Sequence, residues 1–112
     1  MSKKEIKVFF GNKNLQQEFD NLKEGKFESK QLYSFLSRAI SGIKENPFSG
    51  VKIPRKLWPP EFMRKYAIDN LWKYNLPNGW RLIYTIHTNE LMILSIILEW
   101  FDHKGYERRF RY

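Results

Sequence analysis

Three side chains in the C-terminal third of the chain have the chemistry needed to cut RNA. Arg81 lies at the start of a segment in which apolar and other residues alternate. His103 and Tyr106 follow the next apolar segment, residues 91–100. RNA breaks when its own 2′-hydroxyl attacks the adjacent phosphate, provided that protons are exchanged and the charged transition state is neutralised. Arginine pairs with two phosphate oxygens, and histidine exchanges protons near neutral pH. We therefore predict Arg81, His103 and Tyr106 as a catalytic set, with the roles of general acid and general base left open.

Further cations flank this set and are predicted to hold an RNA backbone. Two of them lie two and three residues after Tyr106, and the others lie in a proline-rich stretch at residues 48–60. They are Lys52, Arg55, Lys56, Arg108 and Arg109.

Each of these residues also has a purely structural interpretation. Arg81 could pair with a carboxylate on a strand face, His103 could be exposed to solvent, and Tyr106 could pack its ring on a sheet. A run of basic residues is usually a solvated surface. The prediction of a site therefore depends on whether the fold brings these side chains together.

Composition limits the function classes that fit the chain. The 112 residues carry a net charge of +8 and include no cysteine, so a polyanionic partner is favoured and thiolate chemistry is excluded. The glycines are isolated, so no phosphate-binding loop is present, and the two histidines have no cluster of further ligands around them. We expect no metal and no cofactor. The longest apolar run, residues 91–98, is too short to span a bilayer, and the N-terminus does not resemble a signal peptide, so we expect a cytoplasmic protein.

Apolar periodicity predicts one α+β domain over residues 1–112. The expected order is β-α-α-β-β-β, followed by a basic tail, with a helical hairpin packed on one face of an antiparallel sheet. The other face, with the proline-rich stretch and the tail, is expected to remain free for binding. The expected strands are residues 6–10, 71–76, 80–87 and 91–100, the expected helices are residues 14–25 and 29–45, and a helical turn is expected near residues 60–64.

The remaining aromatic and imidazole groups are expected to be mainly structural. Trp72, Trp80 and Trp100 fall on core-facing positions of the expected strands. Trp58 lies in the proline-rich stretch and is the tryptophan that best fits stacking on a base. His87 lies near a strand end and is assigned no role in the site.

Two motifs in the C-terminal half resemble a known family. The first is Gly79-Trp80-Arg81-Leu82-Ile83-Tyr84, and the second, after an apolar strand, is Glu99-Trp100-Phe101-Asp102-His103-Lys104-Gly105-Tyr106. A strand that opens on arginine, then an apolar strand and a His-Lys-x-Tyr tail, resembles the RelE/ParE toxin superfamily. The element order and the basic composition are similar to that family as well.

The resemblance implies a toxin of a type II toxin–antitoxin pair with a RelE-like, microbial ribonuclease-like fold. RelE-like members cleave mRNA in the ribosomal A site without a metal. By this resemblance, Arg81 would bind the scissile phosphate, His103 and Tyr106 would form an acid/base pair, and the basic residues at 52, 55 and 56 would hold the RNA. The implied partners are mRNA, the ribosome and a cognate antitoxin.

Two other functions fit the same sequence features. ParE-like relatives share the fold but inhibit DNA gyrase, so the chain could be a protein-binding toxin with no enzymatic activity. It could also be a non-catalytic module that binds RNA or the ribosome, with the salt dependence that phosphate contacts confer.

Overall fold

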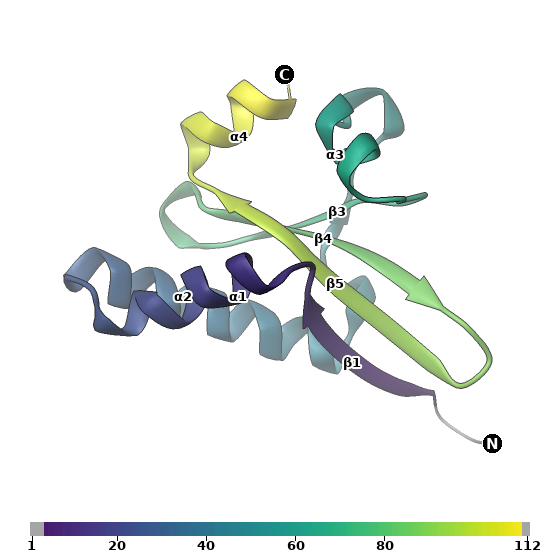
Figure 1. The fold of residues 1–112 in the computed structure, drawn as a ribbon, viewed down its shortest axis with the longest axis horizontal. Coiled ribbons are helices and arrows are strands. Elements are labelled where there is room, and N and C mark those ends of the chain that lie inside the picture. Colours follow the sequence, from purple (N-terminus) through teal and green to yellow (C-terminus); the bar gives the residue numbers. More distant parts are fainter. Residues whose placement is uncertain (1–3, 111–112) are drawn as a thin grey trace.

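A computed structural model describes residues 4–110 and shows an α+β fold with a five-stranded mixed sheet and four helices (Figure 1). The α+β class predicted from periodicity is confirmed. The strands are β1 (Glu5–Phe10), β2 (Val51–Lys52), β3 (Trp72–Asn75), β4 (Arg81–Thr88) and β5 (Met92–Phe101). The helices are α1 (Lys13–Asn21), α2 (Phe27–Glu45), α3 (Pro60–Lys65) and α4 (His103–Phe110).

The strand order in the sheet is β1-β5-β4-β3-β2. β4 is the middle strand, and β5 is an interior strand between β1 and β4. The nearly continuous apolar sequence of β5 is typical of a strand that is covered on both faces. The expectation of a wholly antiparallel sheet was wrong, since β1 pairs with β5 in parallel. The chain passes through α1 and α2 and three further strands before it reaches β5, so local patterning does not reveal this pairing.

The helical hairpin covers one face of the sheet. The buried face of α2 consists of apolar residues at helical spacing, which pack on Leu82, Tyr84 and Ile86 of β4. These residues of α2 are Leu32, Leu36, Ala39 and Ile43. Asn12 caps α1 by accepting a hydrogen bond from the Leu15 backbone N–H at 2.8 Å. Trp72, Trp80 and Trp100 pack against this same cluster, which confirms their predicted place in the core.

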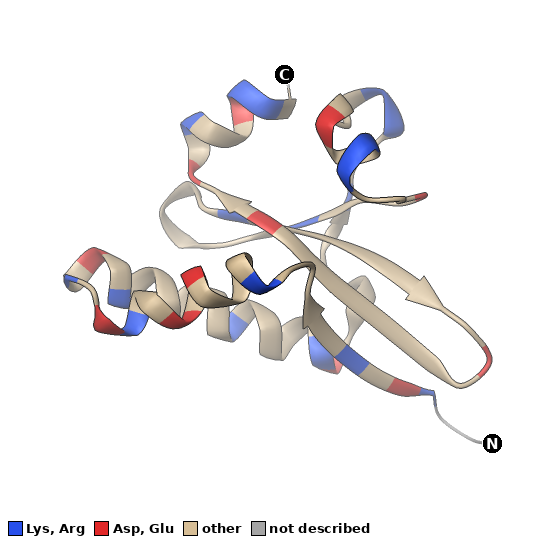
Figure 2. Cartoon of the chain, in the orientation of Figure 1, with Lys and Arg blue, Asp and Glu red and all other residues tan. Residues whose placement is uncertain are grey.

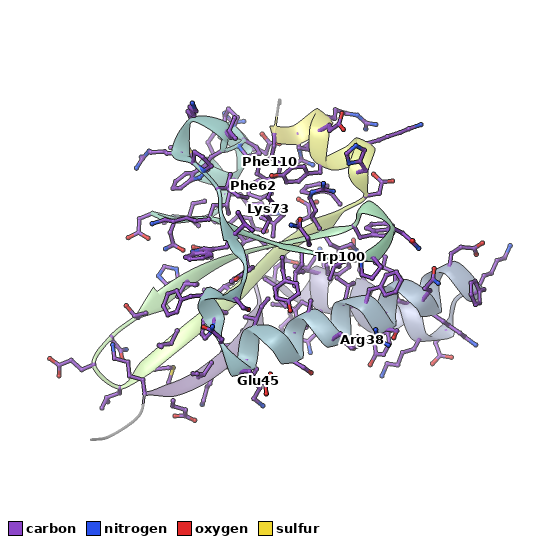
Figure 3. All side chains as sticks on the ribbon, turned by 180° about the vertical axis from the view of Figure 1, so that it is seen from behind. Arg38, Glu45, Phe62, Lys73, Trp100 and Phe110 are labelled. Carbon is purple, nitrogen blue, oxygen red and sulfur yellow. The ribbon has the colours of Figure 1, made fainter. Side chains whose placement is uncertain are left out.

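The opposite face of the sheet is also covered, so the prediction of a free face was wrong. The proline-rich stretch, α3 and α4 lie over it and bury a second apolar cluster. The tail is helical because its apolar residues lie four positions apart: Tyr106 and Phe110 both point inward from α4. Figure 3 shows Phe62 of α3 and Phe110 of α4 meeting above the sheet.

A β-bulge decides which residues of β5 reach each cluster. Ile83 pairs with Glu99, whereas the next residue, Tyr84, pairs with Ile97. Leu98 therefore has no direct partner, and the alternation of side chains reverses there. As a result Ile97 joins the helical cluster, while Leu98 and Phe101 join the second one.

Tyr84 fastens the turn after α2 to the sheet. Its fully buried hydroxyl donates to the Pro47 carbonyl oxygen at 2.8 Å and accepts from the Gly50 N–H at 3.2 Å. We expect Tyr84→Phe to lower the free energy of unfolding by about 1–3 kcal/mol, because two backbone groups lose their partner. Urea denaturation measures this change. Phe48→Leu, at an exposed residue of the same turn, is the control, and equal stability of both variants would contradict the assignment.

The same hydroxyl predicts a dependence on alkaline pH. Burial raises the pKa of Tyr84 from 10.0 to about 12. Because the folded-state pKa is the higher one, the associated stability is complete below pH 10 and is lost as the pH rises toward 12. The slope of stability against pH in this window should be steeper for the wild type than for Tyr84→Phe, and parallel curves would refute the prediction.

Within residues 4–110, no helix combines the length and the apolar character required to cross a membrane.

Candidate functional site

Arg81 lies at the first position of β4, on the face covered by α4. Its neighbours across the sheet are Asn75 of β3 and Phe101 of β5. The half-buried guanidinium donates through Nη1 to the Gly79 carbonyl oxygen at 2.6 Å, and its Nε is buried with no hydrogen-bond partner in the described part of the chain. The hairpin turn thus holds the arginine in a fixed orientation at the strand entrance.

Tyr106 lies beneath two cations. Its ring centroid is 4.8 Å from Cζ of Arg81 and 5.0 Å from Nζ of Lys73, and its ring stacks on Phe110 at 4.5 Å. The negative face of an aromatic ring attracts a cation, so Tyr106 stabilises the positions of both positive groups. Only 1% of Tyr106 is exposed, which fits a supporting platform better than the predicted exchange of a proton with bound RNA.

Lys73 was missed by the sequence analysis, although a signal was present. Trp72 and Tyr74 face the helical cluster, so strand alternation puts Lys73 on the face that carries Arg81. Lys73 is half-buried and pairs with Ile83, two residues along β4 from Arg81. Figure 3 shows it beneath the space between α3 and α4.

His103 begins α4 at the edge of this cluster. Its side chain is 59% exposed, and its Nε2 contacts the Glu107 carboxylate one helical turn later. The hairpin turn connects it to Arg81, because Gly79 both contacts His103 and accepts the hydrogen bond from Arg81. The structure therefore places Arg81 and Tyr106 in direct contact, with His103 beside them across Gly79. Glu107, which orients the imidazole, had not been singled out from the sequence.

Gly79 is required by both its backbone and its surroundings. Its φ is +77°, and an added Cβ would lie 3.0 Å from Cβ of His103. We expect Gly79→Ala to lower the free energy of unfolding by about 1–3 kcal/mol, since a residue with a side chain is strained in this conformation. Thermal melts measure the effect. Gly105→Ala is the control: its added Cβ would also meet an atom at 3.0 Å, Oδ1 of Asp102, but Gly105 does not have a positive φ. Gly79→Ala should therefore lose more stability than this variant.

Arg109 is engaged in a structural network and is therefore a weaker candidate for RNA contact than the sequence predicted. Its Nε donates to Glu61 of α3 at 2.6 Å, and its Nη2 lies 3.8 Å from Glu99 of β5. A backbone hydrogen bond lowers the pKa of Glu61, and Arg109 lowers it further. Burial raises the pKa of Glu99, and Arg109 partly offsets this rise. Through its contacts with these two carboxylates, Arg109 connects α4 to α3 and to β5.

The other predicted RNA-binding cations are exposed, but they do not all lie on this face. Arg108 is exposed on α4, and Lys56 lines a hollow of about 240 Å³ shared with Arg109. Arg55 lies over the ring of Trp58 at 5.3 Å. Lys52 pairs with Trp72, so its side chain leaves the sheet on the face opposite to Arg81. Figure 2 shows basic residues on α4 and on the segments around α3, on the same side of the sheet.

Trp58 does not offer a base-stacking surface, contrary to the sequence-based suggestion. It is 8% exposed and donates through Nε1 to the Ile53 carbonyl oxygen at 2.9 Å. His87 is exposed at the far end of β4, away from this cluster, and nothing gives it a role in the site.

No family model, curated protein or solved structure matched this chain. Among residues 4–110, no group of three or more histidine or acidic side chains is arranged to hold a metal ion. The side chains that meet in the candidate site are Arg81, Lys73, Tyr106, His103 and Glu107.

Proposed function

We propose that the protein is a RelE-like endoribonuclease toxin that cleaves mRNA at the ribosome. One observation carries the proposal: Arg81 and Lys73 lie over the same buried tyrosine ring, beside an exposed histidine that contacts a carboxylate. Two fixed cations suit a phosphate, and an accessible imidazole suits proton transfer. The resemblance of the Arg81 and His103-Lys104-x-Tyr106 motifs to RelE-like toxins agrees with this arrangement.

The proposed reaction uses the nucleophile that RNA already contains. The 2′-oxygen forms a bond to phosphorus and loses its proton, while the bond from phosphorus to the 5′-oxygen breaks and that oxygen gains a proton. The products are a 2′,3′-cyclic phosphate and a 5′-hydroxyl end. Arg81 and Lys73 neutralise the negative charge that accumulates on the phosphate oxygens.

His103 is the proposed proton carrier at this step. It is accessible to solvent, and Glu107 holds the imidazole in one orientation, as carboxylates do for histidine in other proton-transfer sites. Tyr106 is assigned the support of both cations because its ring is buried between them and Phe110. Lys56 and Arg108 are exposed and would bind flanking phosphates.

A neutralising partner follows from the same proposal. A chain with a net charge of +8 attracts an acidic segment, and a small acidic antitoxin would compete with RNA for the basic face. Co-expression of such a partner would restore growth if the protein is toxic.

Inducible expression in a bacterium, with mapping of mRNA 5′ ends, tests the function. Growth arrest accompanied by in-frame cuts in translated messages is the expected result. Arrest with intact mRNA, together with loss of supercoiling by purified gyrase, would instead identify a gyrase inhibitor. Harmless expression with salt-sensitive RNA binding and no cleavage would identify a binding module.

A further inference from the structure

Among residues 4–110, β1 is an edge strand with no strand paired to its outer side. It pairs with β5 on one side only and forms one end of the strand order, and Figure 1 shows it at the border of the sheet. An edge strand of six residues presents a row of backbone donors and acceptors to which another strand can add. β1 pairs with residues 92–97 of β5, whereas Arg81 pairs with Phe101 at the end of β5. The edge strand therefore lies away from Arg81.

The outward-facing backbone groups of β1 follow from its pairing with β5. The Glu5 N–H donates to Leu91 and the Gly11 N–H donates to Ile97, so the odd-numbered residues direct their backbone groups toward β5. Because the direction alternates along a strand, the N–H and C=O groups of the even-numbered residues point outward. These residues are Ile6, Val8 and Phe10.

This pattern fits a second copy of the same strand. If two β1 strands run antiparallel about a twofold axis at Val8, each Val8 faces its counterpart and Ile6 faces Phe10 of the other copy. Each of the three outward-facing residues then belongs to a hydrogen-bonded pair, so the pairing extends along the whole strand. A C₂ contact of this kind is self-complementary by construction.

Charge disfavours one neighbouring register. Shifting the axis from Val8 to Lys7 would place Lys7 directly opposite Lys7 of the other copy, and like charges opposite one another are destabilising. With the axis at Val8, Lys7 faces the ring of Phe9 instead, a favourable cation–aromatic pair. Within each copy Glu5 lies 3.6 Å from Lys7, which reduces the repulsion between the two strands.

The side chains along the edge supply apolar area for such a contact. Phe9 is 52% exposed on β1, and the two copies of Phe9 would be diagonal neighbours in this register. An open groove of about 480 Å³ lies between residues 5–9 and α2, where Ile40 and Lys44 line it. The second copy would cover Phe9 and part of this groove.

We infer that the protein forms a symmetric dimer by antiparallel pairing of β1 with β1 of a second copy, which joins two five-stranded sheets into one. The contact does not involve Arg81 or His103 in either copy. The inference is independent of the proposed ribonuclease activity, since it depends on the strand edge alone.

Sedimentation of the full chain over a range of concentrations tests the dimer. We expect a species of twice the monomer mass whose fraction rises with concentration. Val8→Pro removes an outward N–H but no hydrogen bond to β5, and Pro is tolerated on an edge strand in that position. Phe9→Lys adds a charge opposite Lys7. Each variant should dissociate at least ten times more readily than the wild type.

Phe27→Lys is the matched control, because Phe27 is 73% exposed on α2 and lies outside the proposed contact. It should dimerise like the wild type. A wild type that stays monomeric at high micromolar concentration would overturn the inference. So would a dimer that both β1 variants leave unchanged, because a different surface would then mediate it. Circular dichroism checks that each variant is folded. If Val8→Pro does not fold, Phe9→Lys, at an exposed position, still tests whether β1 forms the dimer contact.

Discussion

Arg81→Ala is expected to lower the rate of mRNA cleavage by about 100- to 1000-fold, the usual effect of removing one fixed donor to a transition-state oxyanion. The guanidinium is held by Gly79 and by the ring of Tyr106, so it is already oriented when RNA arrives. Primer extension on a translated message in a purified translation system measures the rate. Arg81→Lys should recover only part of it, because lysine keeps the charge but loses the paired geometry of the guanidinium.

Arg38→Ala is the matched control for this experiment. Arg38 lies on α2, in the helical layer on the other side of the sheet, as Figure 3 shows. The substitution removes the same charge from the chain and should leave cleavage at the wild-type rate. If Arg81→Ala and Arg38→Ala lose equal activity, net charge rather than position governs the reaction. Full activity of a folded Arg81→Ala protein would refute the proposed site.

Phe62→Ala is expected to lower the free energy of unfolding by about 3–5 kcal/mol. Phe62 is 2% exposed and contacts the rings of Tyr66, Phe101 and Phe110, so the truncation leaves a cavity where α3, β5 and α4 meet. Domains of this size have only about 5–15 kcal/mol of total stability, so the variant should be close to unfolding at 37 °C. Chemical denaturation with two spectroscopic probes measures the loss.

Phe27→Ala provides the control, because the same atoms are removed from an exposed position. Its stability should remain within about 0.5 kcal/mol of the wild type. A Phe62→Ala protein as stable as this control would show that the second apolar cluster does not hold α4 in place. The milder Phe62→Leu should lose less stability and should keep α4 ordered enough for His103 to be assayed.

The sequence alone was sufficient to predict features that depend on one short segment of the chain, such as the faces of a strand or a helix. Alternation along residues 80–87 separates the two faces of β4, and it puts Arg81 on the face opposite the helical hairpin. Pro77, Asn78 and Gly79 are typical of the turn that holds the arginine, and Asn78 and Gly79 adopt the positive φ that such turns use. Helical spacing of apolar residues indicates the buried face of α2 in the same way. In each case the period of the element and the local backbone chemistry contain the information.

The candidate site was only partly predictable. Arg81 and His103 were proposed from residue type and from the family resemblance, and the turn at Gly79 brings them near one another. Lys73 was missed, although the strand alternation already contained the signal. The tail was not recognised as a helix, so the sequence left open whether Tyr106 packs inward, as it does, or exchanges a proton with RNA.

Tertiary structure decided what depends on residues far apart in the chain. The parallel pairing of β1 with β5 joins segments more than eighty residues apart in sequence, and Arg109 meets Glu61 from 48 residues away. The bulge at Leu98 reverses the direction of side chains in β5, which strict alternation cannot anticipate. The sequence by itself determined the elements and their buried faces, because these follow from neighbouring residues. Only the packed fold determined which cations are neutralised by carboxylates and which remain available to a phosphate, because charge pairing depends on distances in space.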